Sequence, residues 1–133
     1  MTDTAATANR SPGFAKKPDY PLEIAAGVER YRVVFNGETV ADSQNVLLMR
    51  ESSYDPVCYF PRQDVRMELL QSTTHGTHCP FKGDASYWSI VAGDRVAESA
   101  VWSYQTPFDE VEEIAGHLAF YPDRVDAIEV VGG

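Results

Sequence analysis

Hydrophobic and polar residues alternate along much of this chain with the period of two that is typical of β-strands. Two short β-prone runs, 32–35 and 39–41, flank the pair Asn36-Gly37. An Asn-Gly pair favours the tight turn of a β-hairpin because both residues tolerate a positive φ. The sequence therefore predicts that the ordered part of the chain opens with a β-hairpin.

A second and longer hairpin is predicted from the runs 85–92 and 95–104 on either side of Gly93-Asp94. Side chains of a strand alternate between its two faces, so one face of the return arm carries Val96, Glu98, Ala100, Trp102 and Tyr104. We therefore expect the Glu98 carboxylate to lie among apolar and aromatic groups, where it must be paired or have a raised pKa.

The remaining elements are shorter. Further strands are expected at 46–50, 57–60, 68–70, 118–121 and 125–130. A short helical turn is expected at 62–67 and a helix at 109–114, whose acidic first turn suits the positive end of the helix dipole. The threonines and histidines that follow residue 70 are predicted to form a loop. The result is a mainly β fold of antiparallel sheets with one or two short helices.

The length of 133 residues and a hydrophobic content of 44% are those of one packed domain. Residues 1–20 are rich in Ala, Thr, Pro and Lys without periodicity, so we expect a loose arm there. The predicted domain spans residues 21–133. The arm could exchange onto a second copy, so a homodimer is one possible oligomeric state, although nothing in the composition requires it.

Charge and cysteine content narrow the function classes. The formal net charge is −9, and no run of Lys or Arg forms a stripe for successive phosphates, which argues against nucleic acid as a partner. No apolar stretch reaches the roughly 20 residues that span a bilayer. We expect a cytoplasmic protein with reduced thiols, because two cysteines are too few for a disulfide framework. No cofactor is expected.

Reactive side chains are concentrated between residues 77 and 88. Pro80 and Gly83 predict a bend within this stretch, and a bend can bring polar side chains together in one cleft. The polar residues are His78, Cys79, Lys82 and Asp84, and they are followed by the aromatic pair Tyr87-Trp88. We interpret this stretch as the core of a functional site.

Several short motifs together resemble a bacterial family, domain-of-unknown-function family 427. They are Tyr59-Phe60-Pro61-Arg62, Asp64-Val65-Arg66, Thr77-His78-Cys79-Pro80, Lys82-Gly83, Tyr87-Trp88 and Phe120-Tyr121-Pro122. The resemblance extends from about Tyr31 to Glu129. It implies a compact β-tent fold, similar to methionine sulfoxide reductase B and translationally controlled tumour protein, with two sheets splayed around a cleft.

The family has no firmly assigned activity. It is also described as nucleotidyltransferase-like, but the residues do not support that activity, because neither a magnesium-binding carboxylate pair nor a phosphate-binding glycine loop is visible. Cys58 stands where the family commonly has an aromatic residue, so no family function is placed on it.

The leading hypothesis is a domain that binds a small polar or anionic metabolite, and catalysis on that ligand is left open. Arg62 and Lys82 would hold its negative group, and Glu98 or His78 would transfer protons, with Cys79 as a candidate nucleophile. The rest of the predicted pocket consists of Asp64 and Asp84 at its floor and Tyr59, Tyr87, Trp88 and Trp102 as its walls.

Each candidate also has a structural interpretation. Cys79 could be an ordinary buried thiol, and Lys82 with Asp84 and Arg62 with Glu98 could be structural ion pairs. His75, His78, Cys79 and Cys58 offer zinc ligands, but their spacing is not that of a zinc site, so no metal is expected. The alternative function is a non-catalytic module whose aromatic surface binds a protein, and a third hypothesis is a redox role for Cys79.

Overall fold

The structure is a computed structural model that describes residues 8–132, and it consists mainly of antiparallel strands. The strands are β1 (Leu22–Ala26), β2 (Arg30–Phe35), β3 (Glu38–Ser43), β4 (Leu47–Glu51), β5 (Val57–Tyr59), β6 (Leu70–Cys79), β7 (Gly83–Ala92), β8 (Arg95–Ser103), β9 (Ala119–Phe120) and β10 (Ala127–Val131). The helices are α2 (Pro12–Lys16) and the 3₁₀ helices η1 (Arg62–Asp64), η2 (Met67–Leu69) and η3 (Asp109–Ile114). The predicted fold class, mainly β with antiparallel sheets and short helices, is confirmed.

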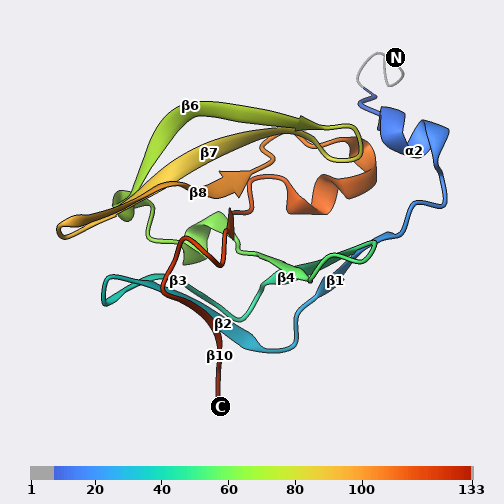
Figure 1. Ribbon diagram of the computed structural model, residues 1–133. Helices are drawn as coiled ribbons and strands as arrows, with labels where there is room; N and C mark the ends of the chain where they lie inside the picture. The colour runs from blue at the N-terminus through green and yellow to red at the C-terminus, as the bar shows by residue number, and fades with distance from the viewer. Residues whose placement is uncertain (1–7, 133) are drawn as a thin grey trace.

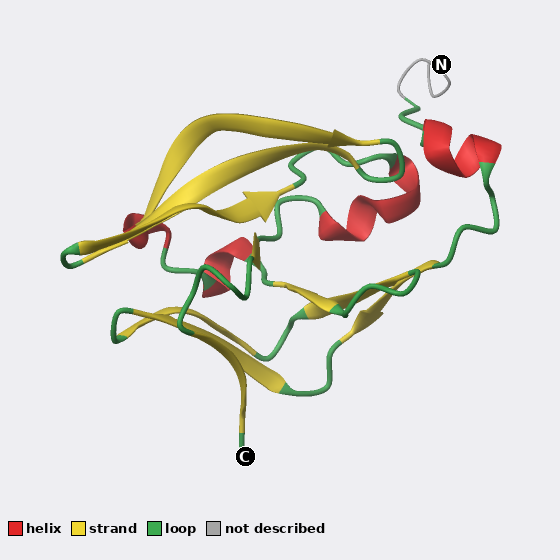
Figure 2. Ribbon diagram, in the orientation of Figure 1, coloured by secondary structure: helices red, strands yellow, loops and turns green. Residues whose placement is uncertain are grey.

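The strands form three sheets arranged in two layers. One layer is the four-stranded sheet β6-β7-β8-β9, and the other contains the sheets β10-β2-β3 and β1-β4-β5 (Figures 1 and 2). Helix η3 lies under the end of the four-stranded sheet that is nearest to α2 (Figure 1). None of the helices within residues 8–132 is long and apolar enough to cross a membrane.

Both predicted hairpins are present. Strands β2 and β3 join through Asn36 and Gly37, whose φ angles of 50° and 77° are the left-handed values that this turn requires. Strands β7 and β8 join through Gly93 and Asp94, and Gly93 also has a positive φ of 61°. The turn residues therefore indicated both hairpins correctly from the sequence.

A bulge in β8 breaks the expected alternation of its side chains. Residues 98–100 all lie opposite the single residue Ser89 of β7. Ser99 has a φ of 47°, and its backbone N–H donates a hydrogen bond to Ser89 Oγ at 3.0 Å. Even-numbered residues are exposed before the bulge, at Val96 and Glu98, and buried beyond it, at Ala100 and Tyr104, so they do not share one environment along this segment.

Residues 70–79 differ from prediction, because the expected threonine and histidine loop is the strand β6. β6 is an edge strand whose residues are mostly exposed, so it lacks the apolar alternation by which strands are recognised. It also carries a bulge, in which residues 73–75 lie opposite Tyr87 alone. The Thr73 hydroxyl donates to the Tyr87 carbonyl at 3.2 Å and holds this bulge against β7.

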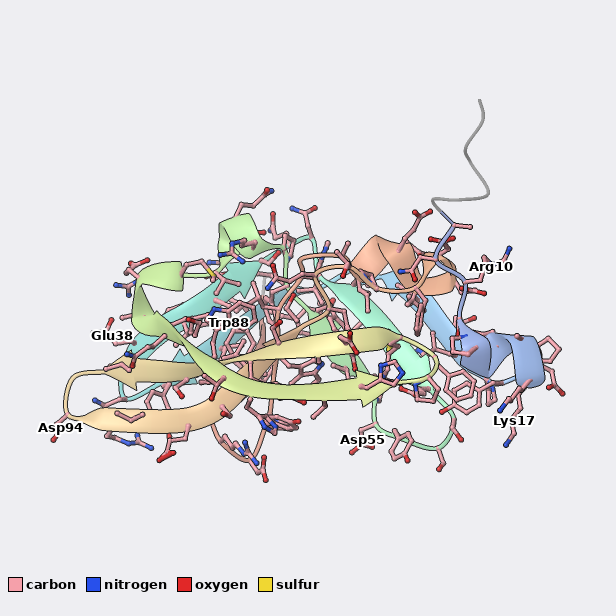
Figure 3. The ribbon with its side chains drawn as sticks, turned by 90° about the horizontal axis from the view of Figure 1, so that it is seen from above. Arg10, Lys17, Glu38, Asp55, Trp88 and Asp94 are labelled. Carbon is pink, nitrogen blue, oxygen red and sulfur yellow. The ribbon has the colours of Figure 1, made fainter. Side chains whose placement is uncertain are left out.

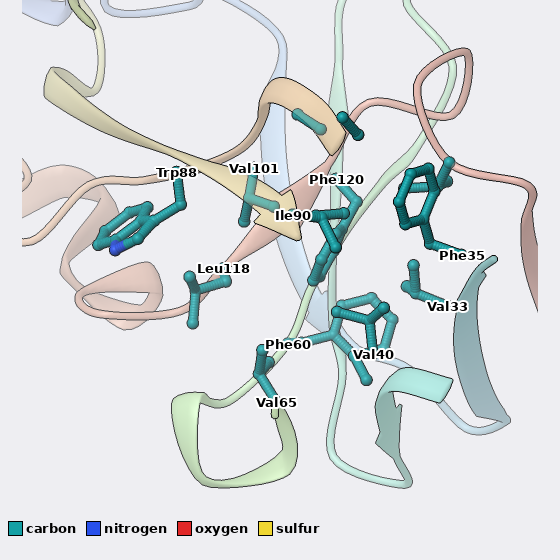
Figure 4. Close-up of a cluster of buried hydrophobic side chains, with 14 of the residues drawn as sticks. Val33, Phe35, Val40, Phe60, Val65, Trp88, Ile90, Val101, Leu118 and Phe120 are labelled. Carbon is teal, nitrogen blue, oxygen red and sulfur yellow. The ribbon is translucent and has the colours of Figure 1, made fainter. Parts of the chain in front are cut away.

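Two clusters of buried side chains stabilise the layers. The larger cluster includes Phe60 and Phe120, whose rings meet edge to face at 5.6 Å between centroids (Figure 4). What we call the second cluster lies between β4, β5 and η3 on one side and β7 on the other. Its buried members are Met49, Tyr59, Ala85, Tyr87, Tyr104, Val111, Ile114 and Ala119.

Residues 8–20, called the N-terminal segment below, pack on the domain and do not form the loose arm expected for 1–20. Helix α2 is capped by the Ser11 hydroxyl, which accepts a hydrogen bond from the Phe14 N–H at 3.1 Å. The same hydroxyl donates to the Pro80 carbonyl at 2.8 Å. Residues 1–7 of the predicted arm lie outside the described residues. Periodicity could not reveal this segment, because a five-residue helix is too short to show it.

The two predicted helical segments are 3₁₀ helices. The region 62–67 contains η1 and the first residue of η2, and the region 109–114 is η3. η3 places the apolar side chains of Val111 and Ile114 in the second cluster. Its acidic residues face outward, apart from Glu110, which accepts a hydrogen bond from the Ser11 N–H at 2.9 Å.

Candidate functional site

A cavity of about 340 Å³ opens between the layers, beside the end of β4 and the turn that joins β6 to β7. We call it the inter-sheet cleft. Its lining residues are Met49, Glu51, Tyr54, Asp55, Val57 and Lys82. Met49 and Val57 are also part of or packed against the second cluster, so they form an apolar floor. Asp55 lies on the loop that follows β4 (Figure 3).

A shielded ion pair borders the inter-sheet cleft. Lys82 Nζ donates to Glu51 Oε1 at 2.7 Å, and the two side chains are only 13% and 16% exposed. The Lys82 ammonium also lies 5.7 Å from the centroid of the Tyr104 ring, a distance at which a cation is attracted to the ring face. Glu51 ends β4 and Lys82 precedes β7, so the pair links the two layers.

Tyr20 of the N-terminal segment completes the environment of Glu51. Its hydroxyl donates to Glu51 Oε2 at 2.7 Å, so each oxygen of this carboxylate has one partner. The hydrogen bond to the carboxylate, together with burial, raises the pKa of Tyr20 to about 12, because an ionised phenol could not donate it. Both cation and phenol therefore hold Glu51 in one orientation.

Two buried tyrosines of the second cluster, Tyr59 and Tyr104, lie near the Lys82–Glu51 pair. Burial is the main cause that raises the pKa of Tyr59 and of Tyr104 above the usual value for tyrosine. Tyr59 Oη accepts a hydrogen bond from Trp102 Nε1 at 3.2 Å. Both phenols remain protonated over the whole physiological range, so they present hydroxyl groups in an apolar setting.

A second group of hydroxyls lies farther along the four-stranded sheet. Tyr87 Oη is 3.0 Å from Thr77 Oγ1 and 3.4 Å from Tyr121 Oη. Burial and the neighbouring Tyr87 hydroxyl raise the pKa of Tyr121 to about 12. Trp102 packs on Tyr121 with 4.5 Å between ring centroids. The surface beside the second cluster is thus formed by aromatic rings, and their hydroxyl groups are held in place by hydrogen bonds.

The structure brings together five of the residues predicted from the sequence. Lys82 lines the inter-sheet cleft, while Tyr59 and Tyr87 belong to the second cluster. Cys79 and Trp102 are half-buried and pack against that cluster. The sequence indicated this half of the site because the bend at 80–83 and the second hairpin are locally encoded.

His78 and Asp84 form a separate pair on the outer surface of the hairpin. They lie directly opposite each other on β6 and β7, and His78 Nδ1 is 2.7 Å from Asp84 Oδ1. The side chains are 57% and 85% exposed. Asp84 therefore pairs with His78, and the expected ion pair between Lys82 and Asp84 is wrong.

Four other predicted residues lie away from the inter-sheet cleft. Trp88 belongs to the larger cluster (Figures 3 and 4), and Arg62 is exposed on η1. Asp64 accepts a hydrogen bond from Ser43 Oγ at 2.6 Å. Glu98 is exposed, so its predicted place among aromatic groups is wrong, and no ion pair joins it to Arg62 within residues 8–132. Glu98 shares its face of β8 with Val96, which is 57% exposed, and this face becomes buried only beyond the bulge, at Ala100.

The candidate zinc ligands are not gathered. Cys58 packs against the larger cluster and Cys79 against the second cluster. Burial raises the pKa of the Cys58 thiol to about 11, which keeps it protonated at neutral pH. Over residues 8–132 we find no group of three or more His, Cys, Asp or Glu side chains that could hold a metal ion.

Sequence reasoning missed the four polar residues near Lys82, namely Tyr20, Glu51, Tyr54 and Asp55, as well as the apolar Met49 and Val57. None of them stands in a recognisable motif, and Tyr20 is separated from Lys82 by more than half of the domain. One signal was available for Glu51. It directly follows the predicted strand 46–50, and the ends of strands are where functional side chains are often placed.

Comparison with known proteins identifies one family. The sequence profile of a domain of unknown function, DUF427, matches residues 23–131, which include every strand after the first residue of β1. No curated protein matches the chain. Of the residues around Glu51, only Tyr20 lies outside the matched range.

Proposed function

This chain belongs to the DUF427 family, and from that premise we propose that it binds a small polar molecule in the inter-sheet cleft, with Lys82 as the main anchor. The same proposal leaves room for chemistry on the ligand but does not depend on it. Support comes from the setting of Lys82, from the composition of the cleft walls and from its size.

Lys82 carries the proposal. It is the only lysine between residues 23 and 131, where the other cationic side chains are arginines and histidines. An ammonium group has three N–H donors, and Glu51 accepts one of them. Burying a charged amine costs free energy that a plain structural ion pair often fails to recover, so its retention at a cavity favours a binding role.

The charges in the inter-sheet cleft favour a ligand with both an acceptor and a donor. Lys82 offers N–H groups to a carbonyl, hydroxyl or carboxylate oxygen, while Asp55 offers a carboxylate to an amine or hydroxyl. A strongly anionic ligand would meet Glu51 and Asp55 as well as Lys82, and Arg62 lies elsewhere. The volume of about 340 Å³ suits a molecule of amino-acid size.

We would test the proposal by a thermal-shift screen of the purified protein against hydroxylated, amino-acid-like and carboxylate metabolites. A compound that stabilises the folded protein by mass action should do so in a concentration-dependent way. In Lys82→Met, we expect that stabilisation to fall by at least about 2 kcal/mol at saturating ligand, the usual cost of losing a charged hydrogen bond.

Matched control variants separate binding from general effects of charge. Lys16→Met removes an exposed lysine of α2, and Glu98→Gln removes an exposed carboxylate of β8. Both should bind as the wild type does. Equal loss in Lys16→Met and Lys82→Met would contradict the proposal, and a screen without any hit would favour the alternative of a protein-interaction module.

A further inference from the structure

We infer that the N-terminal segment is a strap that closes one side of the inter-sheet cleft, and that Tyr20 is its positioning residue, which holds Glu51 against Lys82. This inference rests on the proposed function for what the cleft would bind. Its test reads the Lys82 amine without any ligand, so the two ideas can fail independently.

The strap is attached to the domain along its length. Asn9 N–H donates to Asp109 Oδ2 at 3.0 Å, and the Gly13 N–H donates to the Pro80 carbonyl at 2.9 Å. Directly after the strap, the Pro21 carbonyl accepts a hydrogen bond from the Ser52 N–H at 2.7 Å, next to Glu51. The segment therefore runs from η3, across the β6–β7 turn, to the end of β4.

Aromatic stacking places the strap beside Lys82. The Tyr20 ring stacks on Phe81, with 3.9 Å between centroids and 14° between ring planes. Phe14 meets the same Phe81 ring edge to face at 5.2 Å. Phe81 directly precedes Lys82, so the strap covers the residue next to the amine while its phenol binds the partner carboxylate.

Glycine at position 13 shows how closely the strap fits. A Cβ atom added to Gly13 would lie 2.8 Å from the Pro80 carbonyl oxygen and 2.7 Å from Phe81 Cδ1. The backbone at Pro80 cannot give way as a flexible side chain could. Gly13→Ala should therefore lift α2 from the β6–β7 turn, even though alanine is itself the better helix former.

The family profile begins at residue 23, after the strap. The matched range therefore includes Glu51 and Lys82 but not the strap. A pair within the family domain is completed by a residue from outside it. This arrangement suits a device that adjusts access to the cleft.

The test is acylation of lysine amines by a water-soluble acetylating ester, followed by mass spectrometry of the full-length chain. The sequence has three lysines, and the exposed Lys16 and Lys17 of each molecule serve as internal references for Lys82. In the wild type, Lys82 should react about tenfold more slowly than the references, because reaction requires local opening.

Two variants distinguish closure of the cleft by the strap from positioning of Glu51 by Tyr20. Gly13→Ala should raise the Lys82 rate about tenfold by releasing the strap. Tyr20→Phe keeps the ring that stacks on Phe81 but removes the hydroxyl, so Glu51 loses one donor and the Lys82 rate should rise about threefold. The matched controls are Gly132→Ala, in open space, and Tyr31→Phe, on β2, and both should leave the rate unchanged.

Hydrogen exchange of the same variants checks that the sheets stay folded. Protection should be lost only in residues 12–20 of Gly13→Ala. A Lys82 rate that is unchanged or slower in the folded Tyr20→Phe variant overturns the positioning role. An unchanged rate in Gly13→Ala, with α2 amides unprotected, overturns the closing role. Normal ligand binding in Lys82→Met would instead refute the proposed function and leave the strap intact.

Discussion

Ser99 is the residue at which β8 departs most from regular strand geometry. Its φ of 47° lies in the left-handed region, which costs an ordinary residue roughly 1 kcal/mol and costs glycine almost nothing. The hydrogen bond to Ser89 Oγ uses only the backbone N–H of Ser99, so it survives substitution of the Ser99 side chain. The bulge is therefore maintained by its surroundings against the preference of the serine itself.

We expect Ser99→Gly to raise the free energy of unfolding by up to about 1 kcal/mol, because it relieves this strain. The same substitution at Ser86, an exposed residue of β7 whose φ is not positive, should lower it by about 0.5 to 1 kcal/mol. Urea unfolding of both variants measures the two changes. Equal signs for the pair would show that Ser99 is not strained.

At the scale of elements, the two hairpin turns are joined to each other. Asn36 Nδ2 donates to the carbonyl of the buried Ala92 at 2.8 Å, just before the second turn. The Asn36 N–H donates to Asp126 Oδ2 at 2.7 Å, which adds the start of β10. One turn residue thus connects three segments from both layers.

Asn36→Ala should lower the free energy of unfolding by about 1 to 2 kcal/mol, since it removes the side-chain donor and leaves alanine at a left-handed φ. Asn36→Gly removes the donor but not the favourable turn geometry, so it should cost about 1 kcal/mol or less. Asn45→Ala is the control, because within residues 8–132 only the backbone N–H of Asn45 forms a hydrogen bond. Urea unfolding again gives the values, and equal costs in all three variants would contradict this account.

The same elements show which parts of the fold could be predicted from the sequence. Hairpins and strands with local signals, such as Asn36-Gly37, were predictable because the turn residues themselves determine the geometry. β6 was not, because an exposed edge strand needs no apolar alternation. Glu98 was misplaced because the sequence does not show that its face of β8 is exposed before the bulge and buried beyond it. Lys82 was found through its motif. Its partners Glu51 and Tyr20 were not, because contacts between distant segments are set by the tertiary fold.

At the scale of the whole molecule, buried and hydrogen-bonded tyrosines make the free energy of unfolding decrease at alkaline pH. The pKa values of Tyr20 and Tyr121 are raised from 10.0 to about 12, and those of Tyr59 and Tyr104 are raised as well. A raised pKa in the folded state means that unfolding releases protons above pH 10. The stabilisation is complete below that pH and is lost as pH rises through the folded-state values.

We therefore expect the free energy of unfolding to be nearly constant from neutral pH to about pH 9. It should begin to fall there, because the pKa of Cys58 is raised from 9.0 to about 11, and fall steeply from about pH 10 toward about pH 12 as the tyrosines titrate. Tyr20→Phe should make the fall shallower by about one proton, since the variant has no phenol at that position. Chemical unfolding at several pH values measures both slopes. Identical slopes in the variant and the wild type would show that Tyr20 does not titrate with the fold.

The bulge of residues 73–75 in β6 also affects whether copies of the protein associate through the edge of the four-stranded sheet. β6 is ten residues long, contains no Asp, Glu, Lys, Arg or proline, and forms the rim of the four-stranded sheet. A flat rim of this kind is a template for aggregation, and a local kink is one device that prevents such growth. Removing two of the three bulged residues would straighten the rim, and the expected cost is a protein that precipitates or forms fibrils at concentrations where the wild type stays dispersed.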